Sequence, residues 1–93
     1  MQDTTIEART VTLRYFAWVR EKAGLSEERV TLPASVKTAA DLVAWMQTRG
    51  DTFEAAFANP DAIRLAFDHV HVKRDAPIGA AREIAFFPPV TGG

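Results

Sequence analysis

The sequence closes with Glu83-Ile84-Ala85-Phe86-Phe87-Pro88-Pro89-Val90-Thr91-Gly92-Gly93. Alternating apolar residues predict a strand at Glu83–Phe87, with Ile84 and Phe86 on one face. Proline fixes φ and lacks an N–H, so the strand must end there and the chain must leave the sheet stiffly. Glycine adds a thin, flexible backbone end. We therefore expect a tail, residues 88–93, that presents a terminal carboxylate to a narrow cleft of another protein. A frayed end or a fusion remnant is the alternative for a bare Gly-Gly, but two aromatics and a rigid spacer before it argue against this.

The composition indicates one small domain. The 93 residues are 47% hydrophobic, enough for a single core. The absence of cysteine excludes disulfides, thiolate metal sites and cysteine catalysis. A net charge of −1, with scattered basic residues, argues against nucleic acid binding, and no apolar run is long enough to span a membrane. Residues 1–9 are polar and lack the apolar stretch of a signal peptide, so we expect a flexible N-terminal extension in a cytoplasmic protein.

The first half of the sequence predicts two strands and a helix. Apolar alternation over Val11–Val19 indicates a strand, and Glu28–Leu32 indicates a second strand that forms a hairpin with it around a turn at Lys22–Ser26. Thr38–Arg49 is the strongest helix, with Thr38 and Asp41 in capping-box positions. Gly50 is expected to end this helix.

The second half predicts a short helical turn and three further strands. The turn spans Thr52–Phe57, and the first two strands span Ile63–Phe67 and Val70–Lys73. One helix covers only one face of a sheet, so the other face is left for solvent or a partner. With the first and last strands side by side at the centre, the arrangement is a ubiquitin-like β-grasp of class α+β. We expect a mixed sheet of four to five strands on one main helix, over residues 10–87.

Aromatic side chains are left over on the open face of this sheet. If Leu13 and Tyr15 face the helix, Phe16 and Trp18 point away from it, and the same alternation turns Phe87 outward. Arg14 falls on the same face and can make a polar contact at its rim. Clustered exposed aromatics usually mark a contact surface. The alternatives are that a loop or the N-terminal extension covers them, or that the register is inverted.

The remaining polar residues do not assemble an active site. His69 and His71 share one side of a strand, but a metal site needs a third ligand and none converges, so ordinary surface histidines are favoured and no metal is expected. Glu27, Glu28 and Asp75 are expected to be solvated charges. The sequence contains no nucleophile–histidine–carboxylate set and no glycine-rich phosphate loop.

Three stretches resemble the small subunits of molybdopterin synthase, a family of ubiquitin-like sulfur carriers. Phe16–Glu21 is similar to that family's Phe-Ala-x-Val-Arg-Glu turn, Thr38–Met46 to its helix, and Phe86–Gly93 to its C-terminal motif without substitution. The resemblance covers residues 10–93. It departs at Gly79–Arg82, where the family often has an Asp-Gly turn, and at His71, where an apolar residue is common.

The resemblance implies that Gly93 carries sulfur. A ubiquitin-activating-type adenylyltransferase, using ATP with Mg, would adenylate the Gly93 carboxylate, and a sulfur donor protein would convert it to a thiocarboxylate. The tail would then enter the large synthase subunit and donate sulfur to cyclic pyranopterin monophosphate, building the dithiolene of molybdopterin. The large subunit would supply the catalytic residues in a heterotetramer, and this chain would bind no cofactor itself. The inserted residues would be Pro88, Pro89, Val90, Thr91 and Gly92, and the partner contacts would be Phe16, Phe87, Arg14 and His71.

Three other functions fit the same features. A sulfur carrier for thiamine or tRNA thiolation would use the same fold and adenylate. A ubiquitin-like modifier would also use the adenylate, but would join Gly93 to lysines of other proteins. A non-catalytic interaction domain would need neither terminal glycine.

Overall fold

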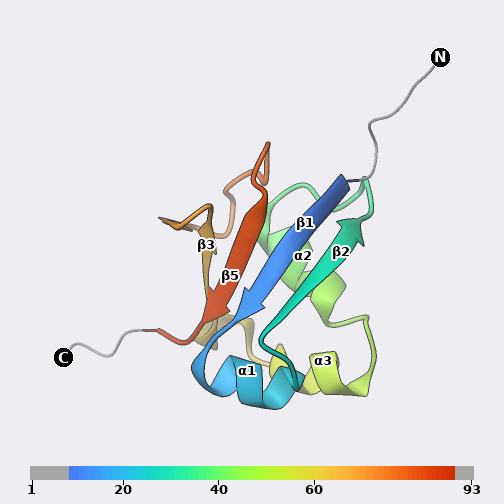
Figure 1. The fold of residues 1–93 in the computed structure, drawn as a ribbon, viewed down its shortest axis with the longest axis vertical. Helices are drawn as coiled ribbons and strands as arrows, with labels where there is room; N and C mark the ends of the chain where they lie inside the picture. The colour runs from blue at the N-terminus through green and yellow to red at the C-terminus, as the bar shows by residue number, and fades with distance from the viewer. Residues whose placement is uncertain (1–8, 90–93) are drawn as a thin grey trace.

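The computed structural model describes residues 9–89. Within this range a five-stranded mixed sheet has the order β2-β1-β5-β3-β4 (Figure 1). The strands are β1 (Arg9–Tyr15), β2 (Glu27–Leu32), β3 (Arg64–Phe67), β4 (Val70–Val72) and β5 (Glu83–Phe87). The helices are α1 (Ala17–Ala23), α2 (Ala39–Met46), α3 (Asp51–Ala56) and a 3₁₀ turn, η1 (Pro60–Ala62). The predicted extension at residues 1–9 lies outside the described residues except for Arg9, which begins β1.

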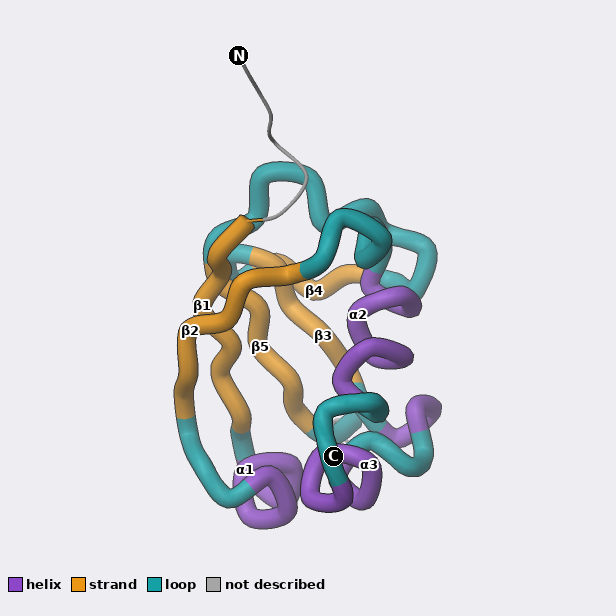
Figure 2. Tube along the Cα trace, turned by 90° about the vertical axis from the view of Figure 1, so that its right-hand side faces the viewer, coloured by secondary structure: helices purple, strands orange, loops and turns teal. Residues whose placement is uncertain are grey.

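The first and last strands lie side by side in the middle of the sheet, as predicted. β1 pairs with β5 in parallel, with Leu13 opposite Ile84 and Tyr15 opposite Phe86, and the other strand pairs are antiparallel. The main helix α2 covers one face of the sheet (Figure 2). The α+β class and the mixed sheet on one main helix are therefore confirmed.

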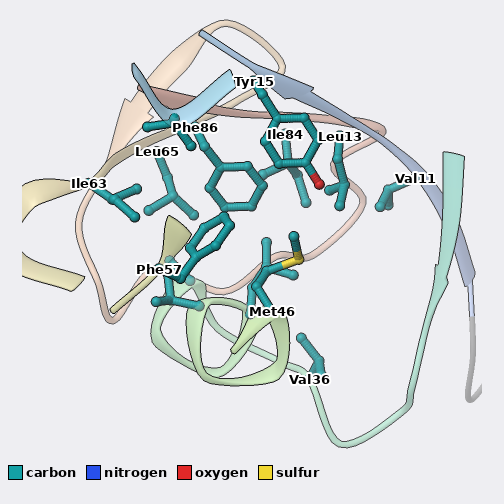
Figure 3. Packing of buried hydrophobic residues seen from close by; sticks show 14 of the residues in the cluster. Val11, Leu13, Tyr15, Val36, Met46, Phe57, Ile63, Leu65, Ile84 and Phe86 are labelled. Carbon is teal, nitrogen blue, oxygen red and sulfur yellow. The ribbon is translucent and has the colours of Figure 1, made fainter. Parts of the chain in front are cut away.

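The core lies between the sheet and α2. Alternate residues of β1 and β5 are buried on the helix side, as the sequence predicted: Val11, Leu13, Tyr15, Ile84 and Phe86. Figure 3 shows the Phe86 ring beside the Tyr15 and Phe57 rings, with ring centroids 5.5 and 4.9 Å apart. This burial leaves the opposite side chains of β1 and β5 on the open face.

The predicted strand Val11–Val19 is wrong in its second half. The strand ends at Tyr15, and α1 follows from Ala17. Val19 and Ala23 are buried four residues apart, the spacing of one helix face, which the strand-like alternation obscured. Gly24 ends α1 with φ 84°. β1 and β2 are thus antiparallel neighbours joined by a helix rather than by a tight turn.

Trp18 is also misplaced by that prediction. It lies on α1, half-buried, and packs against the core instead of pointing outward from the sheet.

Within the described residues, no helix combines the length and apolarity needed to cross a membrane.

The start of α2 follows the sequence prediction and its end does not. Thr38 Oγ1 accepts the Asp41 N–H at 3.1 Å, and the Asp41 carboxylate accepts the Thr38 N–H at 3.1 Å, forming the predicted capping box. The helix ends at Met46, and Gly50, with φ 120°, precedes α3 instead of closing α2. The predicted turn Thr52–Phe57 is α3, with Phe57 fully buried just after it.

Ala17 has a backbone conformation that glycine would adopt at lower energy. Its φ is 54°, in the left-handed region, where a Cβ costs about 1–2 kcal/mol. Ala17→Gly is therefore expected to stabilise the domain by up to about 1 kcal/mol, since glycine also loses more entropy on folding. Ala17→Val is expected to destabilise it, because a β-branched residue tolerates this φ poorly. Melting temperatures of the two variants check the prediction, and equal temperatures would contradict it.

Glu28 is a correction to the sequence analysis, which expected a solvated charge. Its carboxylate accepts the Tyr15 hydroxyl at 2.6 Å and both terminal nitrogens of Arg49 at 2.7 and 3.0 Å. Arg49, by its hydrogen bonds, is the largest cause of the lowered pKa of Glu28, and the hydrogen bond from Tyr15 adds to it. Burial is the main cause of the raised pKa of Tyr15. The cluster ties β1 and β2 to the segment after α2.

We expect Glu28→Gln to destabilise the protein at neutral pH by about 1 kcal/mol, allowing for solvent screening of this partly exposed pair. The pKa of Glu28 in the folded protein lies below its ordinary value of 4.5. The Glu28 carboxylate therefore contributes fully to the free energy of unfolding above pH 4.5, and this contribution is lost as the pH falls through the lowered pKa. Urea unfolding at a series of pH values gives the free energy of unfolding of both proteins. The difference in this free energy between wild type and variant should become smaller below pH 4.5. A difference that stays constant into acid would contradict the assignment.

Candidate docking face and C-terminal tail

The open face of the sheet carries a hollow, here called the docking hollow, that extends along β5 from Glu83 to Phe87, the residue before the tail. It has a volume of about 310 Å³. Its lining residues come from β1, the β1–α1 junction, β3, the β3–β4 turn, β4 and β5: Arg14, Phe16, Ala66, His69, His71, Glu83, Ala85 and Phe87. The four residues predicted as partner contacts, Phe16, Phe87, Arg14 and His71, are therefore brought together around one concavity. Their role as contacts stays a prediction.

Phe16 stands at the junction between β1 and α1, and its backbone is fixed on both sides. Its N–H donates to Phe86 O at 3.0 Å, and its carbonyl accepts the N–H groups of Val19 and Arg20 at 3.1 and 3.3 Å. Its side chain nevertheless remains 42% exposed. A large aromatic side chain held outward from an anchored backbone suits a contact with another protein, because little further ordering is needed on binding.

Phe87 and His71 form another side of the docking hollow. Their ring centroids are 4.9 Å apart, with the planes tilted by 47°. Phe87 is half-buried, lies opposite Arg64 on β3, and is the last residue of β5. Pro88 follows directly, so the docking hollow adjoins the root of the tail.

Arg14 and Glu83 supply charge to the docking hollow. The Arg14 guanidinium lies 3.5 Å from the Glu83 carboxylate, 3.7 Å from that of Glu27 and 5.6 Å from the Phe16 ring centroid. His69 Nε2 is 3.7 Å from the same Glu83 carboxylate. These pairs are partly exposed and contribute little to stability, but they fix the polar groups that a partner would meet.

The histidines do not complete a metal site. Within residues 9–89, no group of three or more His, Cys, Asp or Glu side chains is placed to hold a metal ion. His69 lies in the β3–β4 turn rather than on a strand, so the predicted strand spacing does not hold, although both histidines line the docking hollow.

The tail begins where β5 ends. Pro88 and Pro89 lie outside the strand and are half-buried. Val90, Thr91, Gly92 and Gly93, which were predicted to enter a partner, lie outside the described residues. The structure thus positions the root of the tail beside the docking hollow.

The profile of the ThiS family matches residues 13–93. The chain belongs to the ThiS family. This match spans most of the chain, from β1 through the glycine pair.

Solved structures similar to this ThiS-family chain have the same fold. A protein of Pyrococcus furiosus, described as a candidate subunit 1 of molybdopterin converting factor, is 26% identical with a TM-score of 0.69, over 88% of this chain and 99% of that one. SAMP1 of Haloferax volcanii is 22% identical with a TM-score of 0.64, over 90% and 99%. Another crystal structure, of small archaeal modifier protein 1 from the same organism, is 20% identical with a TM-score of 0.60, and the match covers 88% of this chain and 99% of that one. The ubiquitin-like β-grasp fold and the resemblance to ubiquitin-like sulfur carriers are thereby confirmed.

Sequence reasoning missed half of the residues that line the docking hollow of this ThiS-family chain. Ala66, His69, Glu83 and Ala85 were not among the predicted contacts, although Glu83 and Ala85 alternate with the buried Ile84 and Phe86. The alternation along β5 was sufficient to find Glu83 and Ala85. Ala66 is opposite Ala85 across β3 and β5, a register that the sequence does not specify.

Proposed function

We propose that this ThiS-family chain is the sulfur-carrying small subunit of molybdopterin synthase, acting through a thiocarboxylate at Gly93. One observation carries the proposal: Phe87, on the wall of the docking hollow, is followed directly by Pro88-Pro89 and a sequence that ends in Gly92-Gly93. A partner seated on the docking hollow would meet the root of the tail and receive its end. The family match and the similarity to the Pyrococcus furiosus protein support this function.

The chemistry begins with activation of the terminal carboxylate. Its pKa of about 3.5 makes it an anion at neutral pH, and a carboxylate is a poor electrophile. Attack of the carboxylate on the α-phosphate of ATP, in the cytoplasm and with Mg held by an activating adenylyltransferase, would form an acyl-adenylate and release pyrophosphate. A donor sulfur at the sulfide oxidation level would then attack the acyl carbon and displace AMP, leaving a thiocarboxylate.

Transfer of the sulfur would take place in the large subunit. The thin glycine end fits a narrow active-site channel, and the two prolines limit the entropy lost when the tail enters it. The thiocarboxylate sulfur would add to cyclic pyranopterin monophosphate, and hydrolysis of the acyl group would return the carboxylate. A dithiolene holds two sulfurs and each tail carries one, so each product molecule would consume the sulfur of two thiocarboxylated chains.

Reconstitution tests which acceptor the chain serves. The thiocarboxylated chain is mixed with the large subunit and the pterin precursor, and the dithiolene product is measured by mass spectrometry. We expect product in proportion to the thiocarboxylate supplied, and none from the unloaded chain. Sulfur transfer only to a thiamine precursor or to tRNA would overturn the molybdopterin assignment while retaining the sulfur carrier. A ladder of isopeptide-linked conjugates on a denaturing gel would instead indicate a protein modifier.

A further inference from the structure

The Tyr15 and Phe86 rings connect the root of the tail to the middle of the sheet. The two residues lie opposite each other across the parallel strands β1 and β5. On the helix side of the sheet their rings stack, with centroids 5.5 Å apart and planes tilted by 18° (Figure 3). Phe86 is the last residue of the described chain in the core cluster, and only Phe87 separates it from Pro88. Contacts that hold the Phe86 ring therefore also hold the start of the tail.

The end of β1 also holds Phe86 through its backbone. The Phe16 N–H donates to the Phe86 carbonyl at 3.0 Å, one residue after the Tyr15–Phe86 pair. β1 ends at Tyr15, and the chain turns into α1 through the positive φ of Ala17. This hydrogen bond thus lies at the end of a strand, where local opening costs less free energy than in the middle.

The far end of the Tyr15 side chain is fixed by a charged cluster. Its hydroxyl donates to the Glu28 carboxylate at 2.6 Å, and Glu28 accepts both terminal nitrogens of Arg49 at 2.7 and 3.0 Å. The Arg49 guanidinium in turn lies 4.3 Å from the Phe53 ring centroid and 5.2 Å from that of Trp45. Hydrogen bonds to an ionised group are shorter and stronger than those between neutral groups. The Tyr15 ring is consequently held both at its stacked face and at its hydroxyl.

Packing alone does not require this hydroxyl. Tyr15 is 1% exposed, and phenylalanine would fill the same space without a polar group that needs a partner when buried. Phe57 and Phe86 occupy the same layer of the core with plain rings, 4.9 Å apart. The hydroxyl therefore adds a directional contact that orients the ring stacked on Phe86.

We propose that Tyr15, through its hydrogen bond to Glu28, is a positioning residue that holds the root of the tail in place for adenylation of Gly93. The inference rests on the proposed function, and it takes the activating adenylyltransferase as the enzyme that receives the tail. When the root is already held, less conformational entropy is lost as the tail enters the enzyme. Without the hydroxyl the ring still packs, but the end of β1 and the attached end of β5 open more often.

The variant Tyr15→Phe tests this role, with Thr38→Ala as its structural control. Thr38→Ala removes half of the capping box at the start of α2, which lies outside the Tyr15 cluster, and it also lowers stability. Pyrophosphate release by the activating enzyme is measured over a range of chain concentrations, at a temperature where melting curves show every variant folded. We expect Tyr15→Phe to raise the KM for the chain about fivefold with kcat within about twofold, because only ordering before chemistry is affected. Thr38→Ala should keep the wild-type values of both.

Amide hydrogen exchange reports on the same contact without the enzyme. The Phe16 N–H, which donates to Phe86, should exchange about tenfold faster in Tyr15→Phe than in the wild-type chain. The Leu42 N–H, which donates to the Thr38 carbonyl at 3.0 Å, should change less, since it lies in α2. A second variant, Glu28→Asp, withdraws the acceptor by one methylene group and leaves the tyrosine intact. It should raise the KM in the same direction.

Two results would overturn the inference, and they are distinguishable. If the wild-type chain is adenylated and Tyr15→Phe has the same KM as Thr38→Ala, Tyr15 is a core residue without a positioning role, whereas the proposed function stands. Equal acceleration of exchange at Phe16 and Leu42 would lead to the same conclusion. If an enzyme that is competent on another carrier does not adenylate the wild-type chain, the proposed function fails and the inference fails with it.

Discussion

A chain that lacks Gly92 and Gly93 is expected to accept no sulfur from the activating enzyme and its donor, while unfolding at the same temperature as the full chain. The deletion shortens the tail by about 7 Å and moves the carboxylate to a threonine, whose Cβ restricts both conformation and access. The stability should not change, because the core cluster is built from residues of the folded domain and ends at Phe86. Intact mass after incubation with ATP, enzyme and donor measures the loading.

A deletion of equal length at the other end provides the control. A chain without Gln2 and Asp3 should load sulfur as the full chain does. Normal loading of the chain that lacks the glycine pair would contradict a role for Gly93 and favour a non-catalytic interaction domain.

Phe87→Ala is expected to weaken docking to both the activating enzyme and the large subunit. Truncating an aromatic residue at the centre of an interface typically costs about 2 kcal/mol, or about 30-fold in Kd. Phe87 lines the docking hollow, contacts the His71 ring and precedes the tail, so its loss removes an anchor and the support of a neighbouring contact. Calorimetric titration against each partner gives the change in Kd, and melting curves show whether the domain remains folded.

Val70 offers a matched control for this experiment. It is 63% exposed on β4 and does not line the docking hollow. Val70→Ala should therefore leave both Kd values within about twofold of wild type. Unchanged binding of Phe87→Ala to both partners would place the docking surface elsewhere.

The central part of the fold followed from the sequence because local and long-range signals agreed there. β5 was predicted with its observed bounds, since an alternating apolar run ends at two prolines. The buried face of β1 also followed from its alternation, and the capping box fixed the start of α2.

The errors occurred where strand and helix periodicities overlap, or where contacts between distant residues determine the environment of a side chain. Residues 17–19 continue the alternation of β1, yet the chain turns at Ala17 through a positive φ and Val19 packs as part of a helix. Glu28 was expected to be solvated because its partner, Arg49, lies 21 residues away. The docking hollow depends on small residues, Ala66 and Ala85, whose register across two strands only the structure provides.

The intact mass of the chain, after incubation with ATP, Mg, its activating enzyme and a sulfur donor, tests the central claim most directly. The account predicts a gain that corresponds to the exchange of one oxygen for one sulfur, located at Gly93 by fragmentation. No change of mass, with an activating enzyme shown to be competent on another carrier, would contradict the claim that this chain carries sulfur.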